Sequence, residues 1–173
     1  ETERSSISNR STKLFTISSI KNASKALLRK GNRDPVNLDE MEKAAEFWTA
    51  VTENMSDWNS ARERKVASHE LRMTMVHAHG VILQALGQIG ADLLIRHPKD
   101  WPVFLKKLKN IDWARNNEDW EGRAMVGGKV SKSQRHVTLT TNAIKSALGV
   151  SLTPDERKLE DEFMKGANNA AVE

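Results

Sequence analysis

The 173-residue chain contains no cysteine, no tyrosine and no long apolar run. Without cysteine it cannot form disulfides, thiolate metal sites or a thiol nucleophile, and this fits a reducing compartment. No segment approaches the roughly 20 consecutive apolar residues that a membrane span needs. The start, ETERSSISNRSTK, is polar and has neither a signal peptide nor an initiator Met. We therefore expect a soluble, surface-rich protein that was trimmed or cut from a longer chain.

Charge is unevenly distributed, although the net charge is only +4. Residues 1–33, the N-terminal basic block, hold eight Lys or Arg and two Glu, and residues 120–149, the central basic block, hold five and one. Residues 34–70 and 150–173 are net acidic. If the two basic blocks meet in space, they form a cationic face for a polyanionic partner. If they do not meet, they are ordinary solvated surface.

Apolar residues recur at helical spacing along most of the chain, and no alternating run is long enough to require a sheet. The longest periodic segment spans about 70–96 and ends before His97-Pro98. We predict an all-α fold, an irregular bundle of six to seven helices around a long central helix at 70–96. Residues 126–130 and 137–139 are candidates for short extended pieces.

The predicted organisation has three parts. Residues 1–12, rich in Ser and charge, are expected to be a flexible lead-in. Residues 13–165 are expected to form a single helical domain, the C-terminal portion of a longer protein. Residues 166–173 are expected to be a fraying tail.

Three glycines, Gly80, Gly87 and Gly90, lie inside the predicted central helix. Each destabilises a helix by about 1 kcal/mol relative to Ala unless something compensates. Close packing of another helix against this stripe of small residues is the expected compensation. The same stripe is a candidate surface for dimerisation.

The central basic block, WEGRAMVGGKVSKSQRHVTLTTNAIKSALG, is the stretch around which the chain is organised. Gly122, Gly127 and Gly128 allow close backbone approaches, and a helix is predicted from near Thr138 to Gly149. A cationic, hydroxyl-rich loop that enters a helix start can hold phosphate, because the first-turn N–H groups point at the anion. The predicted nucleic-acid-binding residues are Arg123, Lys129, Lys132, Arg135 and Lys145, with Lys13, Lys21 and Lys25 extending the face.

Catalytic and metal-binding patterns are missing. His77 and His79 are two residues apart, so on a helix they would point about 200° apart, and we expect one or the other to be half-buried and hydrogen-bonded instead. No Ser lies in a G-x-S-x-G elbow, and VGGKVSKS lacks the spacing of a nucleotide-binding loop. We predict no catalytic residues, no metal and no cofactor.

Tryptophans and carboxylates cluster together in residues 112–121. The carboxylates there form either a general acid/base pair or, as we expect, helix-start and loop interactions. Stacking of bases on tryptophan occurs in single-strand binders. We expect core anchoring instead, with the rings of Trp113 and Trp120 packed inward and each ring N–H bonded to a carbonyl.

Several phrases together identify a family resemblance. They are STKLFTISSI (11–20), EFWTAV (46–51), LRMTMVHAHGVILQALGQIG (71–90), IDWARNN (111–117), the whole of 120–149, and LTPDE (152–156). The chain resembles the C-terminal part of the DndB family of DNA sulfur-modification (phosphorothioation) regulators, which contain the DGQHR domain. The similarity runs from about Ser8 to Phe163, and the Asp-Gly-Gln-His-Arg motif itself is absent.

The resemblance implies a bacterial cytoplasmic repressor that binds double-stranded promoter DNA of the sulfur-modification genes. It assigns no DNA contacts in this portion, so the contacts named above come from charge and spacing alone. One alternative is an interaction module that self-associates or docks to DNA sulfur-modification enzymes. A weaker alternative is an enzyme fragment acting on nucleotide or DNA.

Overall fold

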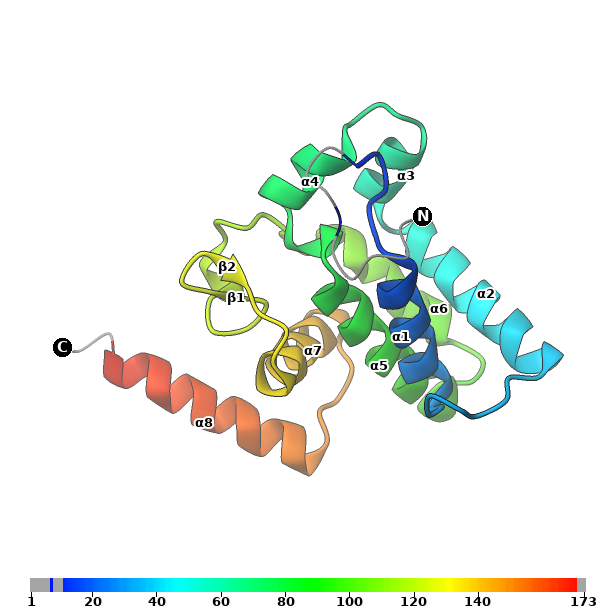
Figure 1. Ribbon diagram of the computed structural model, residues 1–173. Coiled ribbons are helices and arrows are strands. Elements are labelled where there is room, and N and C mark those ends of the chain that lie inside the picture. Colours follow the sequence, from blue (N-terminus) through cyan, green and yellow to red (C-terminus); the bar gives the residue numbers. More distant parts are fainter. Residues whose placement is uncertain (1–6, 8–10, 171–173) are drawn as a thin grey trace.

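The computed structural model describes Ile7 and residues 11–170, with side chains as far as Gly166. The described part is mainly helical and holds only one small hairpin, which confirms the predicted all-α class (Figure 1). Its α-helices are α1 (Ile17–Leu28), α2 (Leu38–Glu53), α3 (Ser56–Arg62), α4 (Ser68–Thr74), α5 (Gly80–Arg96), α6 (Trp101–Leu105), α7 (Gln134–Leu148) and α8 (Pro154–Ala170). Its 3-10 segments are η1 (Val76–Ala78), η2 (Lys106–Asn110) and η3 (Glu118–Trp120), and its strands are β1 (Met125–Val126) and β2 (Lys129–Val130).

The prediction of one central helix over 70–96 is wrong, because the chain breaks into α4, η1 and α5. Met75 and His79 both have extended backbone angles. A partner outside the helix explains the break, since the Val76 N–H donates to the Trp113 carbonyl at 2.8 Å. Helix α5 remains the central, largely buried helix. The break and the short helix α3 account for eight helices in the described part, where six or seven were predicted.

Helix α1 packs along α5 (Figure 1). The two helices run parallel, because Ser19 lies against Gly80 at the start of α5 and Leu27 lies against Gly90 further along it. A Cβ on Gly87 would lie 2.3 Å from the Ala23 carbonyl oxygen, and one on Gly90 would lie 2.5 Å from Leu27 Cδ1. The glycines therefore admit α1 at very close range, which confirms the predicted packing of another helix on this stripe. Because α1 of the same chain covers the stripe, the stripe is not exposed to a second copy, and self-association stays a prediction.

The central basic block begins with the hairpin. Strands β1 and β2 pair antiparallel, with Val126 opposite Lys129. Gly127 and Gly128 form the two-residue turn with φ of 55° and 73°, the positive values that a type I′ turn requires. The piece expected to be extended at 126–130 is extended only at its two ends, because the chain reverses at Gly127 and Gly128.

Helix α7 begins four residues earlier than expected. Ser133 is its N-cap and accepts a hydrogen bond from the His136 N–H at 3.3 Å. The predicted start near Thr138 is therefore wrong, and residues 137–139 are helical rather than extended. The hydroxyl and amide groups of 140–142 are buried inside the bundle instead of lying at a helix start.

The tryptophan pair of residues 113–120 is part of the core. The rings of Trp113 and Trp120 are buried and stacked, with centroids 5.3 Å apart. The Trp113 ring N–H donates to the Leu108 carbonyl at 3.1 Å, and that of Trp120 donates to the Asp112 carbonyl at 2.9 Å. Core anchoring is confirmed for this pair, and burial leaves neither ring face available for a base.

The two ends of the chain fall largely outside the described residues. The predicted lead-in, 1–12, is described only at Ile7, Ser11 and Thr12. Helix α8 continues to Ala170, past the point where the tail was expected, and 171–173 lie outside the described residues. None of the described helices has both the length and the apolar character that crossing a bilayer requires.

Candidate nucleic-acid interface

Three of the predicted DNA-contacting side chains are exposed along one segment. Lys129 lies on β2, Lys132 lies in the link to α7, and Arg135 lies in the first turn of α7. Within the described residues, none of the three forms an ion pair with a carboxylate. Their charges are therefore available to an external anion.

Arg123 is buried, and its place in the predicted interface must be corrected. Its guanidinium donates to both carboxylate oxygens of Glu160 on α8 and to the Leu139 carbonyl at 2.9 Å. The guanidinium also lies 4.5 Å from the centre of the Phe163 ring. A bidentate carboxylate neutralises the charge and fixes its geometry, so Arg123 joins α8 to the domain and cannot reach DNA.

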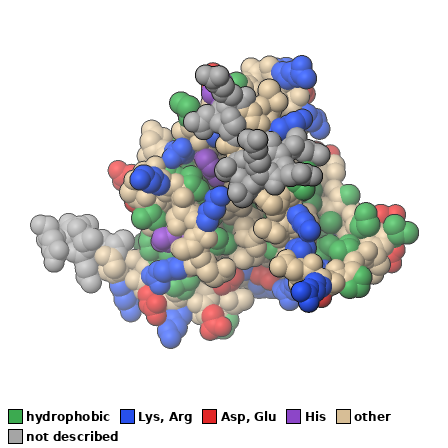
Figure 2. Space-filling model, in the orientation of Figure 1, with side chains coloured by type: hydrophobic (Ala, Val, Ile, Leu, Met, Phe, Trp, Pro, Cys, Tyr) green, Lys and Arg blue, Asp and Glu red, His purple; other side chains and the backbone are tan. Residues whose placement is uncertain are grey.

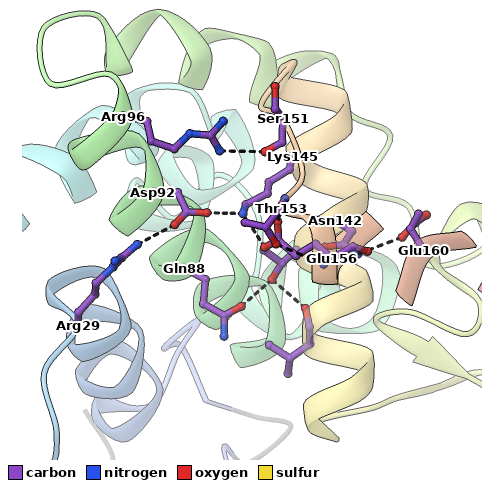
Figure 3. A network of polar contacts seen from close by, with 12 residues as sticks. Arg29, Gln88, Asp92, Arg96, Asn142, Lys145, Ser151, Thr153, Glu156 and Glu160 are labelled. Carbon is purple, nitrogen blue, oxygen red and sulfur yellow. Dashed lines mark hydrogen bonds and ion pairs between the residues drawn. The ribbon is translucent and has the colours of Figure 1, made fainter. Parts of the chain in front are cut away.

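Lys145 is also buried, with only 1% of its side chain exposed, so it too is removed from the interface. Its ammonium group donates to Asp92 on α5 and to Glu156 on α8, the latter at 2.6 Å. Figure 3 shows Lys145 pointing into this network, which Arg29 extends by its 2.9 Å ion pair with Asp92. The network joins the C-cap of α1 to α5, α7 and α8 around one buried positive charge.

The three predicted lysines of the N-terminal basic block lie at different places. Lys13 precedes α1 and is exposed. Ala23 and Leu27 are the buried residues of α1, so helical geometry turns Lys21 and Lys25 away from the α5 contact. The two helix lysines therefore follow the outer side of α1, and their contact with DNA stays a prediction.

Two arginines that no sequence pattern singled out join the two basic blocks. Arg72 on α4 donates to the carbonyls of Ser11 and Lys13. Arg115 donates to the Arg72 carbonyl at 3.2 Å and to the Gly128 carbonyl at 3.0 Å. The N-terminal segment and the hairpin are thereby held at one place, although they are far apart along the chain. Backbone carbonyls carry no sequence signature, which is why both arginines were missed.

A pocket of about 310 Å³ lies at this junction, between the N-termini of α1 and α5; we call it the basic pocket. Its basic residues are His69, Arg72, His79, Arg115 and Lys132. Among the described residues, no Asp or Glu lines it. Figure 2 shows Lys and Arg side chains over the hairpin on this face. The basic pocket thus combines one predicted residue with the two missed arginines.

His79 reports the positive potential of the basic pocket. Its Nε2 lies 2.8 Å from the Arg72 carbonyl. Burial lowers the pKa of His79 to about 4, and the nearby charges of Arg115, Lys132 and Arg72 act in the same direction, against the hydrogen bond to the carbonyl. At neutral pH the imidazole is uncharged, while three cationic side chains surround it.

A second pocket, of about 970 Å³, lies between α8 and residues 110–123 and carries more carboxylates than basic side chains, which are Lys107 and the paired Arg123; we call it the acidic pocket. Its carboxylates are Asp112, Glu118, Asp119 and Glu121. Two of them hold local backbone, since Asp112 accepts from the Ala114 N–H at 3.0 Å and Glu121 from the Gly127 N–H at 2.6 Å. These bonds favour the loop-interaction interpretation, and the negative lining disfavours a polyanion here.

His77 is fully buried, and both of its ring nitrogens form hydrogen bonds. The Trp58 ring N–H donates to Nδ1 at 3.1 Å, so Nε2 carries the proton and donates to Asp57 at 2.8 Å. Burial lowers the pKa of His77, against the effect of Asp57. An imidazole bonded on both sides has no lone pair left for a substrate proton, so this cluster is structural.

No curated protein and no solved structure matches the chain. A family model does match: DndB, described as DNA-sulfur modification-associated, over residues 1–151. The match includes the basic pocket, the hairpin and α7, and it ends before α8 begins at Pro154. The chain therefore belongs to the DndB family and is involved in DNA sulfur modification.

Proposed function

We propose that this chain is a DNA-binding part of a repressor that controls the DNA sulfur-modification genes in the bacterial cytoplasm. One observation carries the proposal: Lys129, Lys132 and Arg135 are exposed on one short segment and have no carboxylate partner within the described residues. Family membership supplies the link to DNA sulfur modification.

The hairpin segment contacts the phosphate backbone in this proposal. Lys and Arg contacts to phosphates position a protein on DNA and do not read its sequence. Each neutralised phosphate of duplex DNA contributes about −0.9 to the slope of log K against log salt, so three contacts contribute about −2.7. Any sequence preference must come from other residues.

A salt titration of duplex DNA binding tests the proposal. We expect the variant Lys129→Ala/Lys132→Ala/Arg135→Ala to flatten the slope by about two to three. The matched control is Lys43→Ala/Lys99→Ala/Lys106→Ala, which removes the same charge from exposed positions around α2 and α6, away from the hairpin (Figure 1). An unchanged slope in the first variant, or an equal loss in the control, would remove the hairpin from the interface.

Docking to the sulfur-modification enzymes is a second candidate function, and the acidic pocket favours it. Four carboxylates stand beside the apolar side chains of Ile111, Phe163 and Met164, a combination that suits a basic, partly apolar segment of a partner protein. Replacing Glu118 and Asp119 by Lys should abolish co-purification with those enzymes while leaving DNA binding intact. Retained co-purification would exclude this pocket as the docking site.

A catalytic role is not part of the proposal. His77 is bonded on both ring nitrogens, and the acidic pocket uses two of its carboxylates for local backbone. Incubation with plasmid and nucleoside triphosphates should give neither nicking nor turnover. Either product would reinstate the enzyme alternative.

A further inference from the structure

We propose that the basic pocket is a binding site for a single phosphate group. The inference goes beyond the proposed function, because it concerns a defined pocket for one anion rather than an exposed cationic surface. It also holds for a small phosphorylated ligand if the chain proves not to bind DNA.

Cationic side chains converge on the pocket, and no carboxylate of the described residues lines it. Arg115 and Lys132 both line it, and neither forms an ion pair within the described residues. Arg115 is held in place by the carbonyls of Arg72 and Gly128. A guanidinium has five N–H donors, and carbonyl partners do not cancel its charge. Arg115 therefore keeps both charge and donors for an anion while its position is fixed by the fold.

The parallel packing of α1 and α5 places two helix N-termini at the same pocket. Gly80, at the start of α5, approaches α1 so closely that a Cβ would lie 2.8 Å from Ser19 Oγ. The N-cap of α5, His79, gives the first turn no side-chain hydrogen bond. Each N-terminus carries about half a positive charge, and an anion between the two relieves their mutual repulsion. The helix ends thus add to the charge that the side chains already supply.

The size and the neutral lining of the pocket also suit a small oxyanion. Its volume of about 310 Å³ is at the lower end of the range, roughly 300–1,000 Å³, found for small-molecule sites. Thr16 and Ser19 line it with hydroxyl groups that bond each other at 2.8 Å, and Thr16 also caps α1, while Phe15 and Ala78 contribute apolar walls. Hydroxyl groups, arginine and helix N–H groups together are the usual partners of phosphate oxygens. The phosphate comes either from a small phosphorylated molecule or from the DNA backbone.

Titration with inorganic phosphate, followed by NMR of the histidine rings, tests the site. Burial is the main reason that the pKa of His79 is low, and the charges of Arg115, Lys132 and Arg72 add to it. An anion in the pocket offsets those charges, so the His79 resonances should shift and its pKa should rise from about 4. His79→Gln assigns the signal. Lys132→Ala should weaken phosphate binding by roughly tenfold. The matched control Lys129→Ala removes a nearby exposed charge that does not line the pocket, and its affinity should stay unchanged.

The inference is overturned if about 10 mM phosphate leaves the His79 resonances unchanged. The dissociation constant for phosphate would then exceed about 10 mM, which is too weak for a specific site. It is overturned as well if Lys129→Ala weakens binding as much as Lys132→Ala, because the effect is then general electrostatics. Circular dichroism of each variant confirms that the fold is retained.

Addition of a short DNA duplex distinguishes the two sources of phosphate. Displacement of bound phosphate by the duplex assigns the pocket to a DNA backbone phosphate. Duplex binding without displacement, or no duplex binding at all, assigns it to a small phosphorylated molecule. In the last case the proposed DNA function fails while the phosphate site stands, so the two failures are separable.

Discussion

Two groups of cations in this chain share one stretch of sequence but have opposite environments. Arg123 and Lys145 lie under α8, where Glu160, Glu156 and Asp92 neutralise them. Lys129, Lys132 and Arg135 lie on the hairpin side, where no described carboxylate pairs with them. Buried pairing turns a cation into a structural link, whereas an uncompensated cation beside a pocket remains available to a ligand.

The same contrast holds between the two pockets. The acidic pocket beside α8 is lined by four carboxylates, and the basic pocket at the α1 and α5 N-termini is lined by none among the described residues. Arg115 illustrates the difference, because it is as firmly held as Arg123 but is held by carbonyls. The charge of the partner, rather than the degree of order, separates a binding residue from a structural one.

The largest effect should come from removing the buried ammonium group. Lys145→Met leaves Asp92 and Glu156 facing each other without their shared counter-charge, so the free energy of unfolding should fall by about 3 to 5 kcal/mol. Lys129→Met, at an exposed position, should change it by less than about 0.5 kcal/mol. Urea titrations measure both. Equal effects in the two variants would break the comparison.

The pH dependence of stability should show the burial of His79 beside the cations of the basic pocket. The pKa of His79 is lowered from 6.5 to about 4, so the unfolded chain takes up this proton first as the pH falls. The contribution of His79 to the free energy of unfolding is fully present above pH 6.5. As the pH falls towards 4, this free energy decreases by at most about 3 kcal/mol. His79→Gln should lack this loss, as unfolding titrations between pH 7 and 4 would show. Parallel curves for the two proteins would contradict a depressed pKa.

A smaller loss should follow from separating the two helices whose ends form the basic pocket. Gly87→Ala places a Cβ within 2.3 Å of the Ala23 carbonyl, and the shift of α1 should destabilise the fold by about 1 to 3 kcal/mol despite better helix propensity. Gly166→Ala is the matched control on α8, where a Cβ meets nothing within 4 Å. It should be neutral or stabilising by up to about 1 kcal/mol. Thermal unfolding compares the two, and a stabilised Gly87→Ala would mean that α1 does not pack this closely.

The smallest effect should be stabilisation by phosphate. A ligand at ten times its dissociation constant raises the free energy of unfolding by about 1.4 kcal/mol. Lys132→Ala should need roughly tenfold more phosphate for the same gain. Chloride at equal ionic strength is the control, and an equal gain from chloride would indicate general screening instead of a site.

Much of the fold followed from local pattern. Helical periodicity gave the all-α class, and three glycines inside a periodic apolar segment correctly indicated close packing of another helix. The paired tryptophans were correctly placed in the core with their ring N–H groups on carbonyls. The break between α4 and α5 was missed because its cause is a hydrogen bond from Val76 to Trp113, a partner that periodicity does not reveal.

The candidate site was predictable only in part. Charge counting found Lys129, Lys132 and Arg135, which are exposed, but it also included Arg123 and Lys145, which are buried. These five residues look alike in the sequence, since each is a cation among hydroxyl groups and glycines. Their environments differ because α8 and α5 bring carboxylates to two of them and to none of the other three.

The sequence by itself determined the helical class, the Gly-Gly turn and the excess of positive charge in two blocks, because these depend on composition and on spacing between near neighbours. Only the tertiary structure decided which cations are neutralised, and only it created the basic pocket from α1, α4, α5 and the link before α7. The physical reason is that electrostatic interaction depends on distance and burial in space. Residues as far apart as Ser19, Arg115 and Lys132 become neighbours only after the chain has folded.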